Sequence, residues 1–142
     1  MYHKIILVGN LGRDPEPRYL PSGTMVCNFS MATSEKWTGQ DGQQQERTIW
    51  WRVAVFGKAG EACNEYLKKG SKVLVEGRMN ADPKTGNPRM FTRQDGSMGT
   101  SFEVTAAAVK FLSSRGETAG GAGGAGAGAL DAEPADESEI PF

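Results

Sequence analysis

A chain of 142 residues has room for one domain and a tail. Its single histidine and its two cysteines, Cys27 and Cys63, match no metal-ligand spacing and no disulfide framework, so both cysteines are predicted to be buried thiols in a reducing compartment. No apolar run is as long as a membrane span, and residues 1–8 are too short and then too polar for a signal peptide. We therefore expect a soluble, cytoplasmic protein.

The formal net charge of −1 hides two parts of opposite charge. Residues 1–115 hold all 16 Lys and Arg against 11 Asp and Glu, which gives +5. Residues 116–142 hold six acidic residues and no basic one, which gives −6. A basic body indicates an anionic partner such as nucleic acid, and the tail has the same sign of charge as that partner.

Apolar runs and alternating patterns predict five β-strands, and two long polar segments separate some of them. The segment over 36–46 is predicted to be an exposed loop, and the segment over 81–99, with its Pro and Gly turn signals, a protruding hairpin. The predicted strands cover residues 4–11, 26–33, 48–56, 72–80 and 101–112.

One segment changes period and predicts a helix over 58–69. Its apolar residues recur at three- and four-residue steps, and two lysines followed by Gly70 supply a stop signal. Five strands with one short helix after the third are the element order of an OB-fold, although other small β-barrels share the strand count. We predict an all-β chain: a five-stranded OB-fold barrel followed by a disordered C-terminal tail.

The strand predicted over 48–56 divides its side chains between two faces, because side chains alternate along a strand. The odd positions form an apolar face for the core, with Trp51 in the core or at a subunit contact: Ile49, Trp51, Val53 and Val55. The even positions carry Trp50 and Phe56 on either side of Arg52. The alternative is that the two rings cap the core, but rings interleaved with arginine suit single-stranded nucleic acid, whose bases stack and whose phosphates pair with guanidinium.

Further candidate contacts lie outside this strand. Trp37, at the start of the first polar segment, and Phe91, inside the second, are candidate stacking rings, although a ring at such a place is often a loop anchor. The candidate phosphate partners are the basic residues Lys4, Arg13, Arg18, Arg52, Lys58, Lys72, Arg78, Arg89 and Arg93.

The end of the sequence divides into a linker and a tip. Residues 116–135 include eleven consecutive Gly and Ala residues, 119–129, and should stay unfolded because they have no apolar side chains to bury. The tip places acids before an apolar end that fits a partner's pocket: Asp136, Glu137, Ser138, Glu139, Ile140, Pro141 and Phe142. The alternative is an acidic tail that only aids solubility.

Several segments resemble the bacterial single-stranded DNA-binding proteins, usually called SSB. The resemblance covers residues 4–112 and 136–142, and these matching motifs are specific only in combination. They are Ile-Leu-Val-Gly-Asn-Leu-Gly-Arg-Asp-Pro at 6–15, Ala-Thr-Ser-Glu-Lys-Trp at 32–37, Trp-Trp-Arg-Val-Ala-Val-Phe-Gly-Lys at 50–58, Glu-Tyr-Leu-Lys-Lys-Gly at 65–70, Val-Glu-Gly at 75–77 and the acidic Ile-Pro-Phe tip.

The resemblance implies a homotetramer of OB-folds that binds single-stranded DNA without sequence preference. It also implies a tip that recruits replication, recombination and repair proteins. The family's stacking rings fall on Trp37, Trp50 and Phe56, and a fourth, usually Trp, falls on Phe91 after an insertion around 81–90. The chain departs from the family at Trp51, where many members have His near the subunit contact, and at Ser138 and Glu139, where a run of Asp is commoner.

Scattered acids and one histidine give no constellation for metal-assisted or acid–base hydrolysis, so we expect no enzyme and no cofactor. An RNA-binding or adaptor OB-fold, or a plasmid or phage paralogue of the family, remains the alternative. The sequence predicts three units: a DNA-binding domain over 1–115, the linker over 116–135 and the tip over 136–142.

Overall fold

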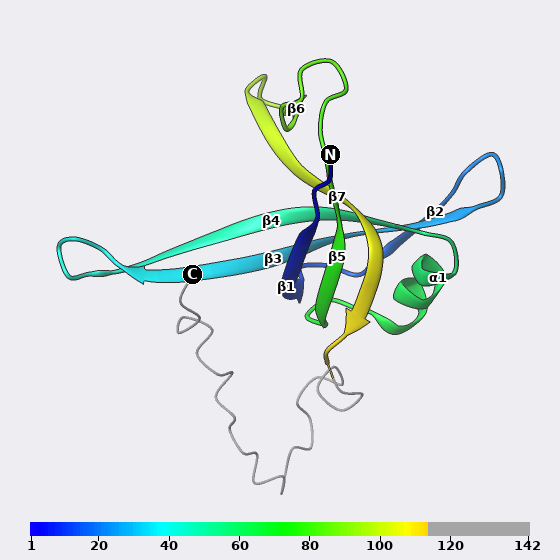
Figure 1. The fold of residues 1–142 in the computed structure, drawn as a ribbon, viewed down its shortest axis with the longest axis horizontal. Coiled ribbons are helices and arrows are strands. Elements are labelled where there is room, and N and C mark those ends of the chain that lie inside the picture. Colours follow the sequence, from blue (N-terminus) through cyan, green and yellow to red (C-terminus); the bar gives the residue numbers. More distant parts are fainter. Residues whose placement is uncertain (114–142) are drawn as a thin grey trace, which may run out of the picture.

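The computed structural model describes residues 1–113, which form seven strands and one helix (Figure 1). The predicted linker and tip lie outside the described residues. The elements are β1 (Ile5–Leu11), β2 (Glu16–Tyr19), β3 (Met25–Thr38), β4 (Gln44–Phe56), α1 (Gly57–Tyr66), β5 (Lys72–Asn80), β6 (Arg89–Thr92) and β7 (Met98–Phe111). No helix in residues 1–113 is long and apolar enough to cross a membrane.

Five of the strands close into a barrel, which confirms the predicted fold class. The hydrogen-bonded order is β1-β5-β7-β4-β3, and β1 pairs again with β3 to complete the ring. That closing seam is short, because it joins only Asn10 to Ala32 and Leu11 to Met31. The pairing of β4 with β7 is parallel, and the other pairings of the ring are antiparallel.

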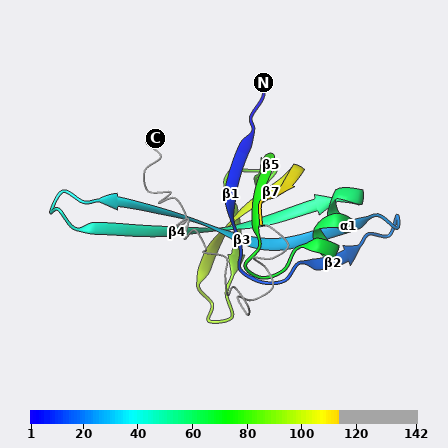
Figure 2. The same ribbon diagram turned by 90° about the horizontal axis from the view of Figure 1, so that it is seen from below.

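β3 and β4 continue beyond the barrel as a two-stranded arm, Ser34–Thr48, which projects to the left in Figure 1 and is seen from below in Figure 2. The loop predicted over 36–46 is therefore wrong: only residues 39–43 connect the strands. The polar residues of the arm are held by cross-strand pairs instead of by burial. The hydroxyl oxygens of Ser34 and Thr48 lie 3.1 Å apart, within hydrogen-bond distance.

Two short strands have no counterpart in the predicted set. β2 pairs with the first residues of β3, and its four side chains are all exposed, so it lacks an alternating pattern. β6 pairs with the start of β7 and forms the protruding hairpin predicted over 81–99. The barrel consequently has three extensions, namely the arm, the β2–β3 hairpin and the β6–β7 hairpin (Figure 1).

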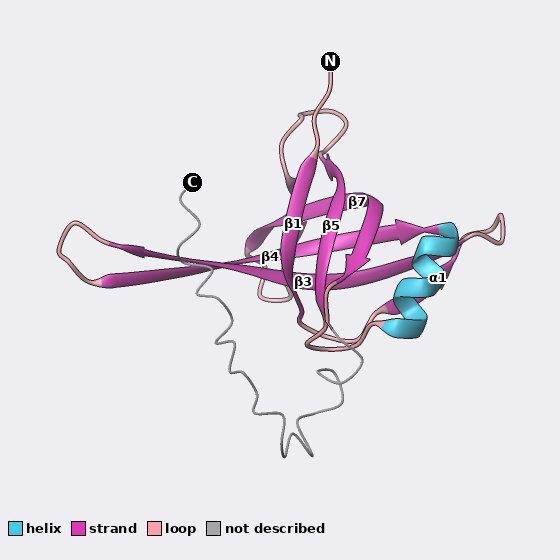
Figure 3. Cartoon of the chain, turned by 60° about the horizontal axis from the view of Figure 1, so that its bottom comes forward, coloured by secondary structure: helices cyan, strands magenta, loops and turns pink. Residues whose placement is uncertain are grey.

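α1 covers one end of the barrel beside β3 and β4 (Figure 3). It ends at Tyr66, three residues before the predicted end at 69, because Leu67 has extended backbone angles and is buried in the core. The two lysines lie beyond the helix, and the positive φ of Gly70 serves the turn into β5. Gly60 lets the helix approach the barrel, since a Cβ there would collide with the Val55 carbonyl.

The core is formed by the inward-facing residues of the barrel strands, together with Cys63 on the helix and Leu67 directly after it. Both cysteines are buried free thiols, as predicted. Burial raises the pKa of Cys27 from 9.0 to about 11 and that of Cys63 to about 12. For Cys63 the neighbouring Cys27 adds to the shift.

Candidate nucleic-acid interface

β4 divides its side chains in the predicted way. Val53 and Val55 face the core and are 1% exposed, whereas Trp50 and Phe56 are 54% and 46% exposed. Arg52 lies between the two exposed rings and is itself exposed. The rings therefore do not cap the core, and this face of β4 is open to solvent.

Trp51 points to the other side and belongs to the core of the chain. Its side chain is 8% exposed, and its ring centroid lies 5.4 Å from that of Phe102 on β7. The indole Nε1 donates a hydrogen bond to Thr33 Oγ1 at 2.9 Å. This bond gives the buried indole N–H a partner and fixes the ring where β3 and β4 leave the barrel.

Trp50 is seated on the segment that follows β1. A Cβ at Gly12 would lie 2.8 Å from Trp50 Cη2 and closer still to Cζ3, so the indole lies directly against the Gly12 backbone. The Gly12 N–H donates to the Ser30 carbonyl at 3.0 Å, which ties this segment to β3. One part of the Trp50 ring is thus supported while the rest stays exposed.

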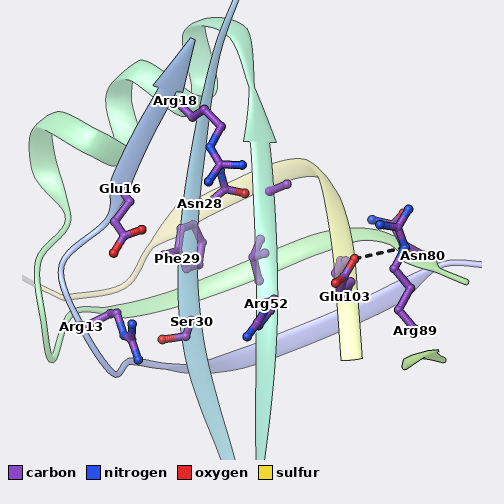
Figure 4. A pocket seen from close by; sticks show the side chains of 13 residues that line it. Arg13, Glu16, Arg18, Asn28, Phe29, Ser30, Arg52, Asn80, Arg89 and Glu103 are labelled. Carbon is purple, nitrogen blue, oxygen red and sulfur yellow. Dashed lines mark ion pairs between the residues drawn. The ribbon is translucent and has the colours of Figure 1, made fainter. Parts of the chain in front are cut away.

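A cavity of about 530 Å³ lies across the outer surface of β3, β4 and β7. Figure 4 shows Arg13 and Arg18 on one side of it, Arg89 on the other and Arg52 between them. Four positive side chains face only two carboxylates there, those of Glu16 and Glu103. The polar floor includes Asn28 and Ser30. The arrangement offers an anion several guanidinium groups along one surface.

One of the two carboxylates, that of Glu103, is paired with an arginine. Glu103 Oε2 is 3.6 Å from Arg89 Nε, and this ion pair is drawn in Figure 4. Glu103 also accepts a hydrogen bond from the Ser101 hydroxyl at 3.3 Å. An anion that binds Arg89 must therefore compete with Glu103.

A second cavity, of about 330 Å³, adjoins the first and shares Arg13, Ser30 and Arg52 with it. Three aromatic residues line this cavity, Trp50 and Trp51 from β4 and Phe91 from the β6–β7 hairpin. The hydroxyl residues Thr100 and Ser101 complete the lining on β7. Rings, hydroxyl groups and guanidinium groups in one space fit a nucleotide, which has a flat base and a charged phosphate.

Phe91 reaches this site from the β6–β7 hairpin, opposite Gly99 in the strand register. The guanidinium carbons of Arg52 and Arg93 each lie 5.6 Å from its ring centroid, within cation–π range. Arg93 is also tied to the hairpin, because it donates to the Met98 carbonyl at 2.9 Å. The structure thus brings Phe91 and Arg52 together, a contact that the sequence analysis did not predict.

Trp37 lies on the arm and lines neither cavity. It pairs with Gln45, whereas Trp50 pairs with Ala32, so the two indoles occupy opposite local faces of the β3–β4 ribbon. Its ring is 45% exposed and carries the guanidinium of Arg47 at 5.5 Å. The sequence interpretation did not include Arg47.

Several predicted contacts are not brought into these cavities. Lys4 forms an ion pair with Glu76 at 2.8 Å, and this hydrogen bond raises the pKa of Lys4 and lowers that of Glu76. Phe56 lies at the far end of β4 from Trp50. The other predicted basic residues outside both linings are Lys58 on α1, Lys72 and Arg78 on β5, and Arg93, which follows β6 and contacts the Phe91 ring.

The sequence interpretation missed partners that come from distant segments. Gly12 and Glu103 contact site residues only because the barrel places the segment after β1 and strand β7 beside β3 and β4. Asn28 and Ser30 on β3 were likewise not named as site residues, although they line the larger cavity. Their alternation with buried Cys27 and Phe29 was the available signal, because it places them on the same face as Arg52.

Comparisons with known proteins agree with this geometry. Residues 2–112 match the model of the single-strand binding protein family. A single-stranded DNA-binding protein of Neisseria meningitidis serogroup A is 44% identical over 120 residues, covering 84% of this chain and 65% of that protein. One from Wolinella succinogenes is 40% identical over 134 residues, covering 94% of this chain and 78% of that protein.

Among solved structures, the Plasmodium falciparum SSB in complex with ssDNA is similar at 25% identity and a TM-score of 0.65. The match covers 80% of this chain and 97% of that one. The chain spans 65% of the length of the Neisseria relative. On the match of residues 2–112 and on relatives at 40–44% identity, the chain belongs to the single-strand binding protein family.

Proposed function

We propose that this protein is a non-catalytic coat for single-stranded DNA that binds without sequence preference. The observation that carries the proposal is the pair of adjoining cavities, in which Trp50 and Phe91 stand beside Arg13 and Arg52. Family membership and a solved relative in complex with ssDNA support the same function. Coating of this kind keeps strands from re-pairing and protects them from nucleases.

The rings account for a preference for single strands. Bases in a duplex are stacked on one another, so only an unpaired strand can turn its bases onto Trp50, Phe91, Trp37 or Phe56. Stacking on an aromatic side chain contributes about 1–3 kcal/mol per base and tolerates every base, because each base has a flat face. Three or four such rings would supply much of the affinity without reading sequence.

The arginines account for binding of the backbone. Each phosphate that a guanidinium group neutralises releases counterions from the strand, and the logarithmic salt slope steepens by about 0.7 per phosphate on single strands. Arg13, Arg18, Arg52 and Arg89 share one cavity and are the cations we assign to phosphates. Lys4, Lys58, Lys72 and Arg78, predicted from the sequence, would act only on a strand that extends beyond the cavities.

Titration of the full chain with oligo(dT) tests the proposal, because Trp50 and Trp37 report stacking through quenching of their emission. We expect strong quenching at low salt and weaker affinity at a second, higher salt concentration. Competition with poly(U) then compares DNA with RNA. Tryptophan fluorescence that does not change when oligo(dT) is added would overturn the proposal. Equal or tighter binding of poly(U) would favour an RNA-binding protein.

We also propose that the protein forms a homo-oligomer, with the tetramer expected from the family. The outward residues Ile6 and Val8 of β1 are 59% and 38% exposed, and Val8 pairs with half-buried Leu74 on β5. Within residues 1–113, β1 pairs with β3 through Asn10 and Leu11 only, so most of that edge has no strand beside it. An apolar strand at an open edge favours pairing with a second copy. Light scattering of the free protein gives the mass.

For residues 136–142 we propose docking to replication, recombination and repair proteins in the cytoplasm. The support is the order of acids before Ile140, Pro141 and Phe142, with charges that steer and a ring that fills a pocket. Burial of the Phe142 ring contributes on the order of 1.5–3 kcal/mol. Deletion of Phe142 should weaken capture of those proteins and leave oligo(dT) binding intact; unchanged capture would contradict docking.

A further inference from the structure

Three residues on the arm form a compact group around Trp37. Glu35 and Arg47 are directly opposite each other in the β3–β4 register, and Trp37 lies two residues after Glu35 on the same face. Arg47 Nη2 donates to Glu35 Oε2 at 2.6 Å. The guanidinium carbon of the same arginine lies 5.5 Å from the Trp37 ring centroid.

This geometry gives the Arg47 guanidinium group two partners on the arm. The carboxylate of Glu35 holds the guanidinium group from one side, and the group contacts the indole of Trp37 from its cross-strand position. With Arg47 covering part of it, the Trp37 side chain still keeps 45% of its surface exposed. A flat cation on part of the ring leaves the remaining surface for another flat partner.

The arm itself supplies little other support for the ring. It is a two-stranded ribbon outside the barrel, and its residues 34–48 are exposed except for half-buried Gly39. Isolated two-stranded ribbons are only marginally ordered in water, so side chains on them keep most of their rotamers unless a neighbour restricts them. Trp50 rests on Gly12 in the segment after β1, whereas no glycine in residues 1–113 has the Trp37 ring among its nearest neighbours.

We infer that Glu35 and Arg47 are a positioning pair that holds the Trp37 indole ready for a nucleobase. The inference rests on the proposed function and extends it, because it assigns a role in binding to two residues that need not contact the strand. Glu35 neutralises Arg47, so the pair carries no net charge and is a poor phosphate ligand. Its contribution is the order that it gives the ring before binding, which lowers the entropy lost on stacking.

The direction in which Glu35→Gln changes the affinity for the strand separates this role from simple electrostatics. Glu35→Gln removes a negative charge from a protein that binds a polyanion, so electrostatics alone predicts tighter binding. The positioning role predicts weaker binding, by roughly two- to tenfold, since Arg47 is released from the ring. Glu46→Gln is the matched control: it removes the same charge from the same arm but on the opposite local face, beside Lys36. We expect it to tighten binding slightly.

Two substitutions of Arg47 test the planar contact. Arg47→Lys keeps the charge but loses the flat guanidinium group and its hydrogen-bonding fork, so it should weaken binding nearly as much as Arg47→Ala. The salt slope should stay the same in both variants, because a neutralised arginine releases no counterion from the strand. A salt slope that falls in Arg47→Ala and is restored in Arg47→Lys would make Arg47 a phosphate contact and overturn the inference.

The measurements use the full chain and a labelled oligo(dT), and they are repeated in a Trp37→Ala background. There Glu35→Gln should lose its weakening effect and behave like Glu46→Gln. If Trp37→Ala weakens binding but Glu35→Gln tightens it as Glu46→Gln does, the positioning role fails and the proposed function stands. If Trp37→Ala changes nothing, the ring has no part in binding and the inference fails with it. If the unaltered chain does not bind oligo(dT), the proposed function itself is wrong.

Discussion

Trp50 lies against Gly12, so closely that residue 12 has no room for a side chain: a Cβ would lie 2.8 Å from Cη2 of the indole. Gly12→Ala should push the ring off its seat without touching the core. We expect the binding free energy for oligo(dT) to weaken by about 1–3 kcal/mol, the contribution of one stacked base. The melting temperature should change little. Fluorescence titration and thermal unfolding measure the two effects.

The control for this prediction is a double-mutant cycle. If Gly12 acts through Trp50, Gly12→Ala should add almost nothing to the loss caused by Trp50→Ala, because the ring that it displaces is already absent. Losses that add in full would mean that Gly12 contacts the strand by itself.

Phe91 and Arg52 are the second pair for which coupling is expected. The ring on the β6–β7 hairpin lies 5.6 Å from the guanidinium carbon of Arg52, and both residues line the smaller cavity. Phe91→Ala should remove a stacking surface and also release Arg52, so the cost should exceed that of one ring alone. Phe91→Trp keeps both functions and should bind at least as tightly. A cycle over Phe91→Ala and Arg52→Ala with no coupling energy would contradict a joint role.

How far the sequence predicts this fold depends on whether a strand buries one face. β5 was predicted at its observed bounds and the alternation of β4 was correct, because apolar side chains on those strands meet the core. The arm was missed since Ser34–Thr48 buries neither face and is held by pairs such as Glu35 with Arg47. Such pairs become visible only when the register of the two strands is known.

The site residues likewise fall into those that one strand places by itself and those that depend on contacts between distant segments. Trp50, Arg52 and Phe56 could be placed outward from one strand, because alternation is a local property. The seat of Trp50 on Gly12 and the pairing of Arg89 with Glu103 depend on how distant segments meet in the barrel. The predicted helix was too long for a related reason: its apolar spacing continues through Leu67, which enters the core as extended chain.

The buried thiols make the free energy of unfolding depend on pH in alkaline solution. The folded state keeps Cys27 and Cys63 protonated, with pKa values of about 11 and about 12, whereas in the unfolded chain both thiols ionise near the ordinary value of 9.0. A pKa raised by folding contributes stability that is complete below 9 and is lost as the pH rises toward the folded values. The free energy of unfolding should therefore fall between about pH 9 and pH 11.

Denaturant titrations over that range check this prediction, with Cys63→Ala as the control. The variant removes the thiol with the higher pKa, so its stability should fall less steeply over the same pH interval. Thiol reagents at pH 8 should also react slowly with the folded chain and quickly once it is unfolded. Rapid labelling of both cysteines in the folded protein would show that the thiols are accessible.

Glu103 places a negative charge, in addition to that of Glu16, in a cavity that four arginines line. Its carboxylate lies 3.6 Å from Arg89 and occupies the guanidinium group that a phosphate would need. Glu103→Gln keeps an acceptor for the Ser101 hydroxyl but frees Arg89, so we expect tighter binding and a logarithmic salt slope steeper by about 0.7. Glu76→Gln removes an equal charge beside Lys4, outside both cavities, and should leave the slope unchanged if the strand does not extend there. Equal effects of the two substitutions would mean that Glu103 acts only through the net charge of the protein, and not by holding Arg89.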